Sequence, residues 1–129
     1  MTCLVLSLNL LMLWVSSGAT RAKVGVAINP EDGASVTDLD PPAVARFLRA
    51  HRNAEATIYP FLLLGLVYIL AGGRAGVAIP IFAIFVVARI THSIVYLRAM
   101  QPCRTIAFAA SLLAIIALMA AVLHDLLSA

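Results

Sequence analysis

Four long apolar stretches constrain what this chain can fold into more than any other feature of its sequence. A helix needs roughly 20 mostly apolar residues to cross about 30 Å of hydrocarbon. We expect helices over about residues 3–23, 42–71, 75–98 and 103–127. Only 12% of the 129 residues are charged and 63% are hydrophobic, whereas about a quarter of a soluble domain is charged. The sequence therefore predicts an all-α protein, an integral membrane four-helix bundle that forms a single membrane domain over residues 1–129.

The connections between these helices predict the topology. The second, third and fourth helices are joined by a few residues each, which indicates antiparallel neighbours. The polar loop over about residues 24–41 holds turn formers and acids, and Asp38 or Asp40 is expected to cap the following helix. Basic residues flank the first loop (Arg21, Lys23 and Arg46) and the third loop (Arg98 and Arg104). The second loop has Arg74 alone. The positive-inside rule therefore places the first and third loops in the cytoplasm.

The same features bound the location and the class of protein. The first apolar stretch precedes its basic residues instead of following them, so we expect a retained helix and not a signal peptide. We expect a bacterial inner membrane rather than a eukaryotic endomembrane, because the sequence carries no retention signal. The net charge is +3, and the nine basic residues are spread singly along the helices instead of forming a dense patch. This distribution argues against nucleic-acid binding. Cys3 and Cys103 form no metal-ligand spacing, so no metal site is expected.

Polar and charged side chains at membrane depth are the informative feature inside these helices. A charge there costs on the order of 2.5–3.5 kcal/mol on insertion scales, so it normally faces a bundle interior or a wet cavity. Two groups stand at helical spacing, at the end next to the first and third loops: Arg49, Arg52 and Asn53; Arg89, His92, Ser93 and Tyr96. The fourth segment opens at the same end with Arg104 and Thr105, and Phe108 and Ser111 continue near that face. We expect these groups to surround a polar cavity that opens to the cytoplasm.

A cavity rich in arginine and poor in acids favours an anionic ligand, because guanidinium groups bind carboxylates through paired hydrogen bonds. A ligand with two carboxylates, or a thiolate that needs stabilising, fits this chemistry. Two structural alternatives stay open here: Arg89 pairs with Glu55 or a backbone carbonyl, and His92 is an ordinary interior histidine. Four helices hardly enclose a pocket while burying three polar groups, so we expect a homo-oligomer with the cavity between adjacent subunits.

Four sequence motifs occur in the order typical of one family. The run from Arg49 to Leu62, RAHRNAEATIYPFL, resembles the second-helix signature of the MAPEG family, the membrane-associated proteins of eicosanoid and glutathione metabolism. Asn29-Pro30-Glu31-Asp32 resembles its first-loop motif, Arg89 to Tyr96 its third-helix motif, and Pro102 to Thr105 the start of its fourth helix. The resemblance covers about residues 21–110 and points to the branch of prostaglandin E synthases and microsomal glutathione transferases.

The resemblance implies a homotrimer that binds glutathione between adjacent subunits near the cytoplasmic side, while a lipophilic second substrate arrives from the lipid bilayer. Matched by position, the glutathione-binding residues are Arg21, Arg52, Asn53, His92, Tyr96, Arg104 and Thr105. Arg104 is expected to hold the thiolate and Thr105 to assist it, and Asp32 matches a loop acid proposed for synthase-type chemistry. Arg49 and Arg89 match supporting positions, and Glu55 stands one residue from a third.

Two positions depart from the family pattern. Where the pattern has a glutamate one turn after Asn53, this chain has Ala56, and Glu55 points about 100° away from the stripe. Phe108 stands where the prostaglandin synthases have a tyrosine. These departures predict a weakened glutathione site or a site for a different thiol.

The leading hypothesis is a glutathione-dependent membrane enzyme, a glutathione S-transferase or peroxidase that acts on lipophilic electrophiles or hydroperoxides. Arg104 would activate the thiolate, because a neighbouring guanidinium favours the ionised form of a thiol, whose unperturbed pKa lies near about 8.5. One alternative is a prostaglandin-E-synthase-like isomerase, and another is a non-catalytic membrane adaptor with the same fold. A transporter is disfavoured because the sequence shows no broken helices or internal repeats.

Overall fold

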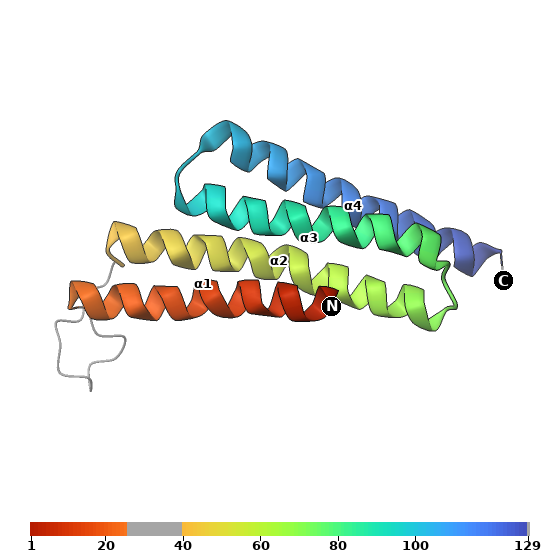
Figure 1. The fold of residues 1–129 in the computed structure, drawn as a ribbon, viewed down its shortest axis with the longest axis horizontal. Coiled ribbons are helices and arrows are strands. Elements are labelled where there is room, and N and C mark those ends of the chain that lie inside the picture. The colour runs from red at the N-terminus through yellow and green to blue at the C-terminus, as the bar shows by residue number, and fades with distance from the viewer. Residues whose placement is uncertain (26–39, 129) are drawn as a thin grey trace.

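Four α-helices make up the computed structural model, which describes residues 1–25 and 40–128. They are α1 (Thr2–Val24), α2 (Pro42–Leu70), α3 (Ala75–Leu97) and α4 (Gln101–Leu127). Each helix runs antiparallel to the next, with α1 lying along α2 and α3 lying along α4 (Figure 1). Among the described residues, no Cα atom of α1 comes within 8 Å of α4. The all-α, four-helix prediction is confirmed, and each observed helix begins and ends within two residues of its expected bounds.

Helix α2 begins without the expected aspartate cap. Pro41 takes the cap position and Pro42 the first helical position, where the missing N–H of proline costs no hydrogen bond. Asp40 instead pairs with Arg21 at the end of α1, so the expectation that Asp40 caps the helix was wrong. The other candidate, Asp38, lies outside the described residues. The ion pair joins the end of α1 to the start of α2.

The turn between α2 and α3 depends on the close approach of a glycine to a tyrosine ring. A Cβ atom on Gly73 would stand 2.4 Å from Cε1 of Tyr68, whose side chain is buried. The Tyr68 hydroxyl accepts a hydrogen bond of 3.1 Å from the backbone N–H of Arg74. The ring therefore anchors the turn on two sides, and only glycine fits at position 73.

Three phenylalanine rings hold α2 against α3 at mid-bundle. Phe61 stacks on Phe85 with ring centroids 3.7 Å apart and an interplanar angle of 5°. Phe61 also meets Phe82 edge-on at 5.2 Å. Lipid is as apolar as these rings, so close packing and not the hydrophobic effect stabilises the contact. The stack sets the register of the two helices, and one to two turns away it leaves Asn53 beside Arg89.

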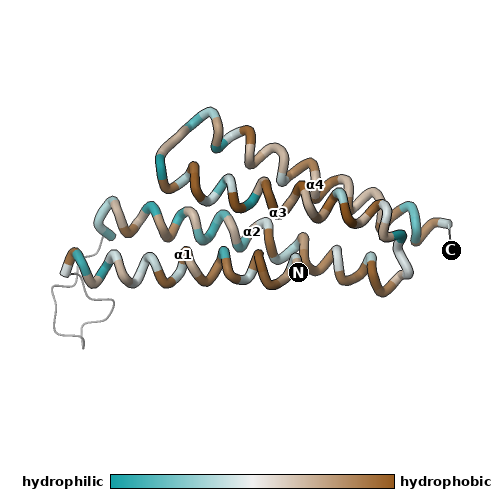
Figure 2. Tube along the Cα trace, in the orientation of Figure 1, coloured by the Kyte–Doolittle hydropathy of each residue, from teal (hydrophilic) through white to brown (hydrophobic). Residues whose placement is uncertain are grey.

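Apolar side chains cover the outside of the bundle. Leu63, Val87 and Leu113 are each more than 60% exposed, and they belong to three different helices. All four helices are long and apolar enough to cross a membrane. Hydrophilic residues gather toward the end where α1 stops and α2 starts, whereas the middle of the bundle is hydrophobic (Figure 2). Such a surface suits hydrocarbon, and it leaves the polar end of the bundle as the place for chemistry.

Candidate functional site

A polar cavity of about 300 Å³ lies between α2, α3 and α4, near the end where α3 joins α4. Six side chains line it: Asn53 from α2, His92 and Tyr96 from α3, and Arg104, Thr105 and Phe108 from α4. Helical spacing explains the grouping, because residues four apart share one face of a helix. The structure therefore brings together five of the seven residues that the sequence predicted to bind the ligand, and it adds Phe108 to the wall.

Aromatic rings hold the Arg104 guanidinium at the cavity. Its Cζ atom lies 5.0 Å from the centroid of the Tyr96 ring, a cation–π distance. The His92 ring lies 5.6 Å from Tyr96 and 6.1 Å from Phe108, so the three rings form one continuous wall. Within residues 1–25 and 40–128, no carboxylate pairs with Arg104. Its N–H groups are therefore available to an anionic ligand.

A buried arginine stands behind this cavity and fixes one of its members. Arg89 has no exposed surface, and its Nη2 donates a 3.1 Å hydrogen bond to Oδ1 of Asn53. The alternative that Arg89 pairs with Glu55 is wrong, since Asn53 takes that place. Because the amide oxygen of Asn53 is engaged by Arg89, its NH₂ group is the part that remains for the cavity. Asn53 therefore offers a ligand the two N–H donors of its amide, while Arg89 uses one of the two lone pairs of its oxygen.

Several buried polar atoms near Arg89 have no hydrogen-bond partner in the described part of the chain. They are Nε and Nη1 of Arg89, Nδ1 of His92 and Oγ of Ser93, all on one face of α3. Buried polar groups in proteins are almost always paired, with protein, water or ligand. This region is therefore the least satisfied part of the bundle, as expected of a binding site rather than of plain core.

Glu55 belongs to a different face of α2. Its carboxylate accepts a 3.2 Å hydrogen bond from the Tyr59 hydroxyl and lies 3.4 Å from Nδ1 of His51. These three side chains share a second cavity, of about 390 Å³, with Leu10, Leu11 and Trp14 of α1. Helical spacing predicted that Glu55 lies off the stripe of Asn53, and the two residues do line different cavities. His51 was not among the predicted site residues, although its spacing of four residues from Glu55 was a usable signal.

The remaining predicted residues do not reach the Asn53 cavity within one copy of the chain. Arg21 pairs with Asp40 at the end of α1, a helix with no Cα atom within 8 Å of α4. Arg49 and Arg52 are exposed on the outside of α2. Asp32, with the rest of the first-loop motif, lies outside the described residues. A single subunit therefore presents part of the predicted constellation and leaves its arginines from α1 and α2 outside.

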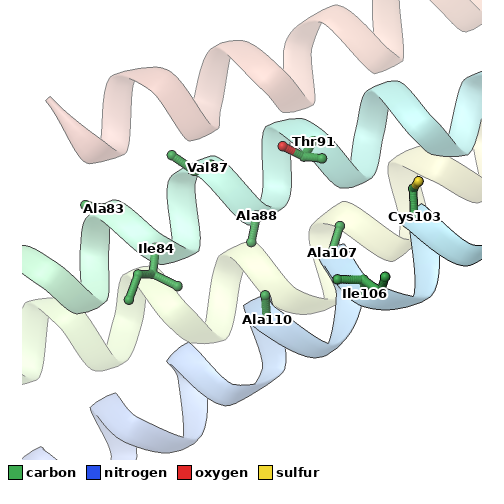
Figure 3. Close-up of a pocket in the computed structure, with 9 residues that line it drawn as sticks. All are labelled: Ala83, Ile84, Val87, Ala88, Thr91, Cys103, Ile106, Ala107 and Ala110. Atoms are coloured by element: carbon green, nitrogen blue, oxygen red, sulfur yellow. The ribbon is translucent and has the colours of Figure 1, made fainter.

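A third cavity, of about 530 Å³, is an apolar groove between α3 and α4 (Figure 3). Alanine, isoleucine and valine side chains line it, and Thr91 and Cys103 are its polar members. It offers no group that would hold a charged ligand. Cys103 immediately precedes Arg104, so the groove and the polar cavity use adjacent faces of the same turn of α4.

The fold and the cavity define a class: a multi-pass integral membrane protein whose helices surround a cationic, donor-rich site near one end. Sequence comparison makes the assignment specific, because a profile of the MAPEG family matches residues 1–124. This chain belongs to the MAPEG family.

Three named proteins show how similar this chain is to its relatives. Prostaglandin E synthase of Homo sapiens is 36% identical over 109 residues, which cover 81% of this chain and 72% of that protein. The prostaglandin E synthase of Equus caballus is 40% identical over 99 residues, or 73% of this chain and 65% of that protein. Microsomal glutathione S-transferase 1 of Bos taurus is 48% identical over 66 residues, which cover 50% of this chain and 43% of that protein.

Proposed function

We propose that this protein is a glutathione-dependent membrane enzyme that activates the glutathione thiol with Arg104 for reaction with lipophilic electrophiles or hydroperoxides. The observation that carries the proposal is the cavity in which Asn53, His92, Tyr96, Arg104 and Thr105 converge. The relatives support it, since one is named a glutathione S-transferase and the others are named prostaglandin E synthases.

The electrostatics of the cavity suit glutathione, which carries two carboxylates and a thiol. Arg104 lies free of carboxylates in the described part of the chain, and Asn53 presents its NH₂ group. Anions accepting hydrogen bonds from guanidinium and amide donors bind through charge-assisted contacts, the stronger class of hydrogen bond. The Tyr96 ring keeps the guanidinium in place through a cation–π contact, which leaves the N–H edge for a ligand.

The chemistry follows from the charge on Arg104. A guanidinium beside the glutathione sulfur stabilises the thiolate, which is the nucleophilic form. In conjugation, the sulfur forms a bond to an electrophilic carbon and the leaving group departs with its electron pair. In peroxide reduction, the sulfur takes one oxygen of the hydroperoxide, which leaves an alcohol, and a second glutathione then gives the disulfide and water. We assign assisting roles to the Thr105 hydroxyl and to Asp32.

We further propose a homotrimer with glutathione bound between adjacent copies on the cytoplasmic side. Arg21 and Arg52 lie outside the cavity of their own copy, so a neighbouring copy must contribute at least one of them if both contact the ligand. The many exposed small residues of α4, such as Ala109 and Ala117, allow close helix approach between copies. The loop arginines favour the cytoplasmic face for this end of the bundle.

A glutathione titration of the purified protein in detergent tests the proposal. We expect a saturable ultraviolet thiolate signal at neutral pH, and we expect Arg104→Ala to abolish it while the oligomer stays intact on size-exclusion chromatography. Arg98→Ala is the matched control, because Arg98 is exposed at the end of α3 and should leave the signal unchanged. A thiolate signal in Arg104→Ala equal to that of the native protein would refute the role of Arg104. If the native protein binds no glutathione up to millimolar concentration, the result would favour the adaptor hypothesis.

A second candidate, isomerisation of a lipid endoperoxide, is favoured by the name prostaglandin E synthase of relatives that match 73% and 81% of this chain. Phe108 lines the cavity and offers no hydroxyl at that position. We expect Phe108→Tyr to raise any isomerase activity severalfold while leaving glutathione affinity within about twofold. A Phe108→Tyr variant that converts an endoperoxide no faster than the parent would count against this candidate.

A further inference from the structure

Helix α2 carries two polar faces at nearly the same depth. Asn53 faces the cavity between α2, α3 and α4, whereas Glu55 lies in the cavity beside α1. Two residues of helix separate them, which is about 3 Å along the axis and about 200° around it. The two faces therefore look in opposite directions from one level of the bundle.

The Glu55 face is only partly covered by protein in a single copy of the chain. The Glu55 side chain is 34% exposed and Tyr59 is 56% exposed. Among the described residues, the carboxylate accepts one hydrogen bond, from Tyr59, and has His51 as a 3.4 Å ion-pair neighbour, although a carboxylate accepts about four hydrogen bonds. A charged side chain at membrane level normally faces protein or a wet cavity and not lipid. This face therefore requires a packing partner whose groups are positively charged or donate hydrogen bonds to Glu55.

The Asn53 face has the complementary deficit. Arg89 is fully buried and Arg104 borders the cavity, and the described residues provide no carboxylate partner for either. The amide oxygen of Asn53 is already engaged by Arg89. A ligand that carries an ammonium group, as glutathione does, would find cations and donors here and no anion to receive it.

We propose that Glu55 of one copy completes the cavity of the adjacent copy and receives the ligand's ammonium group there. The proposal rests on the thiol-binding function and the ring assembly proposed above. Rotation about an axis along the membrane normal keeps every residue at its depth, and a head-to-tail ring brings unlike faces together. The Glu55 face of one copy and the Asn53 face of the next therefore meet level, with opposite charges.

The position of Arg21 supports this pairing of faces. Arg21 follows Trp14 by seven residues, so both lie on one side of α1, and Trp14 lines the Glu55 cavity. The predicted ligand residue from α1 thus lies on the same side of the subunit as Glu55. Both would approach the ligand from the neighbouring copy.

Two thiols that differ only in the ammonium group test the inference: glutathione and glutaryl-Cys-Gly. We expect the native protein to bind glutathione about tenfold more tightly, the usual effect of a charge-assisted hydrogen bond. Glu55→Gln should bring the ratio close to one by weakening glutathione alone. An unchanged affinity for glutaryl-Cys-Gly shows that the variant is folded. Asp125→Asn, at the far end of α4, is the control and should keep the ratio.

Mixed trimers decide which copy supplies Glu55. Chains carrying Glu55→Gln and chains carrying Arg104→Ala are given different tags, expressed together and purified on both tags. Each mixed ring should contain one site in three with both Arg104 and a neighbour's Glu55, so about a third of the native thiolate signal returns. The glutathione concentration should saturate the native site but not the Glu55→Gln site.

The outcomes separate the two proposals. If the native protein binds neither thiol, the proposed function fails and the inference fails with it. Equal affinity for the two thiols would overturn the role of Glu55 and leave the proposed function standing. A ratio that depends on Glu55, with no signal regained in mixed trimers, would place Glu55 in its own copy's site and refute the exchange between copies.

Discussion

Arg89 provides the sharpest test of the reasoning about buried polar groups. It is completely buried, makes one hydrogen bond to Asn53 and leaves Nε and Nη1 without partners among the described residues. Replacing a buried charged group by an apolar residue of similar shape is often neutral or stabilising. We therefore expect Arg89→Met to stabilise the folded bundle while it weakens ligand binding.

The magnitude follows from the hydrogen bonds. Arg89→Met loses one charge-assisted bond, worth about 1.5–3 kcal/mol, and relieves two buried unpaired groups at about 1–3 kcal/mol each. Taken at the middle of each range, these terms give a net gain of about 1–2 kcal/mol. Arg89→Ala should instead destabilise the bundle by about 2–4 kcal/mol, because it opens a cavity that methionine would fill.

Circular dichroism during unfolding in mixed detergents measures this difference, and glutathione titration measures the loss of affinity. We expect about a tenfold weaker affinity in Arg89→Met, because Asn53 loses the bond that orients its amide. Asn53→Ala should lower the free energy of unfolding more in the native protein than in the Arg89→Met variant. In the native protein the substitution leaves the Arg89 guanidinium without its partner, whereas methionine has no donor to lose. A stability loss above about 1 kcal/mol in Arg89→Met would refute the view that Arg89 is under-satisfied, and unchanged affinity would refute its orienting role.

Three further outcomes are expected. Gly73→Ala should destabilise the bundle by about 1–3 kcal/mol, because its Cβ would overlap the Tyr68 ring; detergent unfolding checks this. Phe61→Ala should cost about 3–5 kcal/mol by the same measurement, since it removes the ring stacked on Phe85, and a loss under about 1 kcal/mol would contradict the packing argument. Arg104→Lys should keep part of the thiolate signal, because the charge stays while the planar contact with the aromatic wall is lost; a signal as low as in Arg104→Ala would show that charge alone is insufficient.

Much of the fold was readable from the sequence because length and apolarity fix where a helix can cross a bilayer. The grouping of His92 with Tyr96, and of both with Arg104, was readable because helical spacing puts them on stripes at one end. The partner of Arg89 was not readable from spacing, since it depends on how α2 and α3 are rotated about their axes. The stacked Phe61 and Phe85 set that rotation, and nothing in their spacing reveals it.

Helical periodicity predicted the directions of Asn53 and Glu55 but not the side chains that each would face. Asn53 and Glu55 are two positions apart in sequence, and the rotation of about 100° per residue predicted that they diverge. What each would face depends on the positions of α1 and α4, which lie on opposite sides of the bundle with no Cα atoms within 8 Å of each other. Sequence periodicity describes one helix at a time, whereas the site is a property of three.

The hydrogen bond between Arg89 and Asn53 also bears on how the protein is made. Synthesis proceeds from the N-terminus, so α2 and its amide oxygen enter the membrane before the arginine of α3 does. The turn between them spans four residues, Ala71–Arg74, which suits insertion of the two helices together as a hairpin. The arginine would then never meet lipid alone, and the insertion penalty of a buried cation would be reduced before the helix is released from the translocation machinery. The bond that orders the site in the finished protein thus also protects the buried arginine of α3 during assembly.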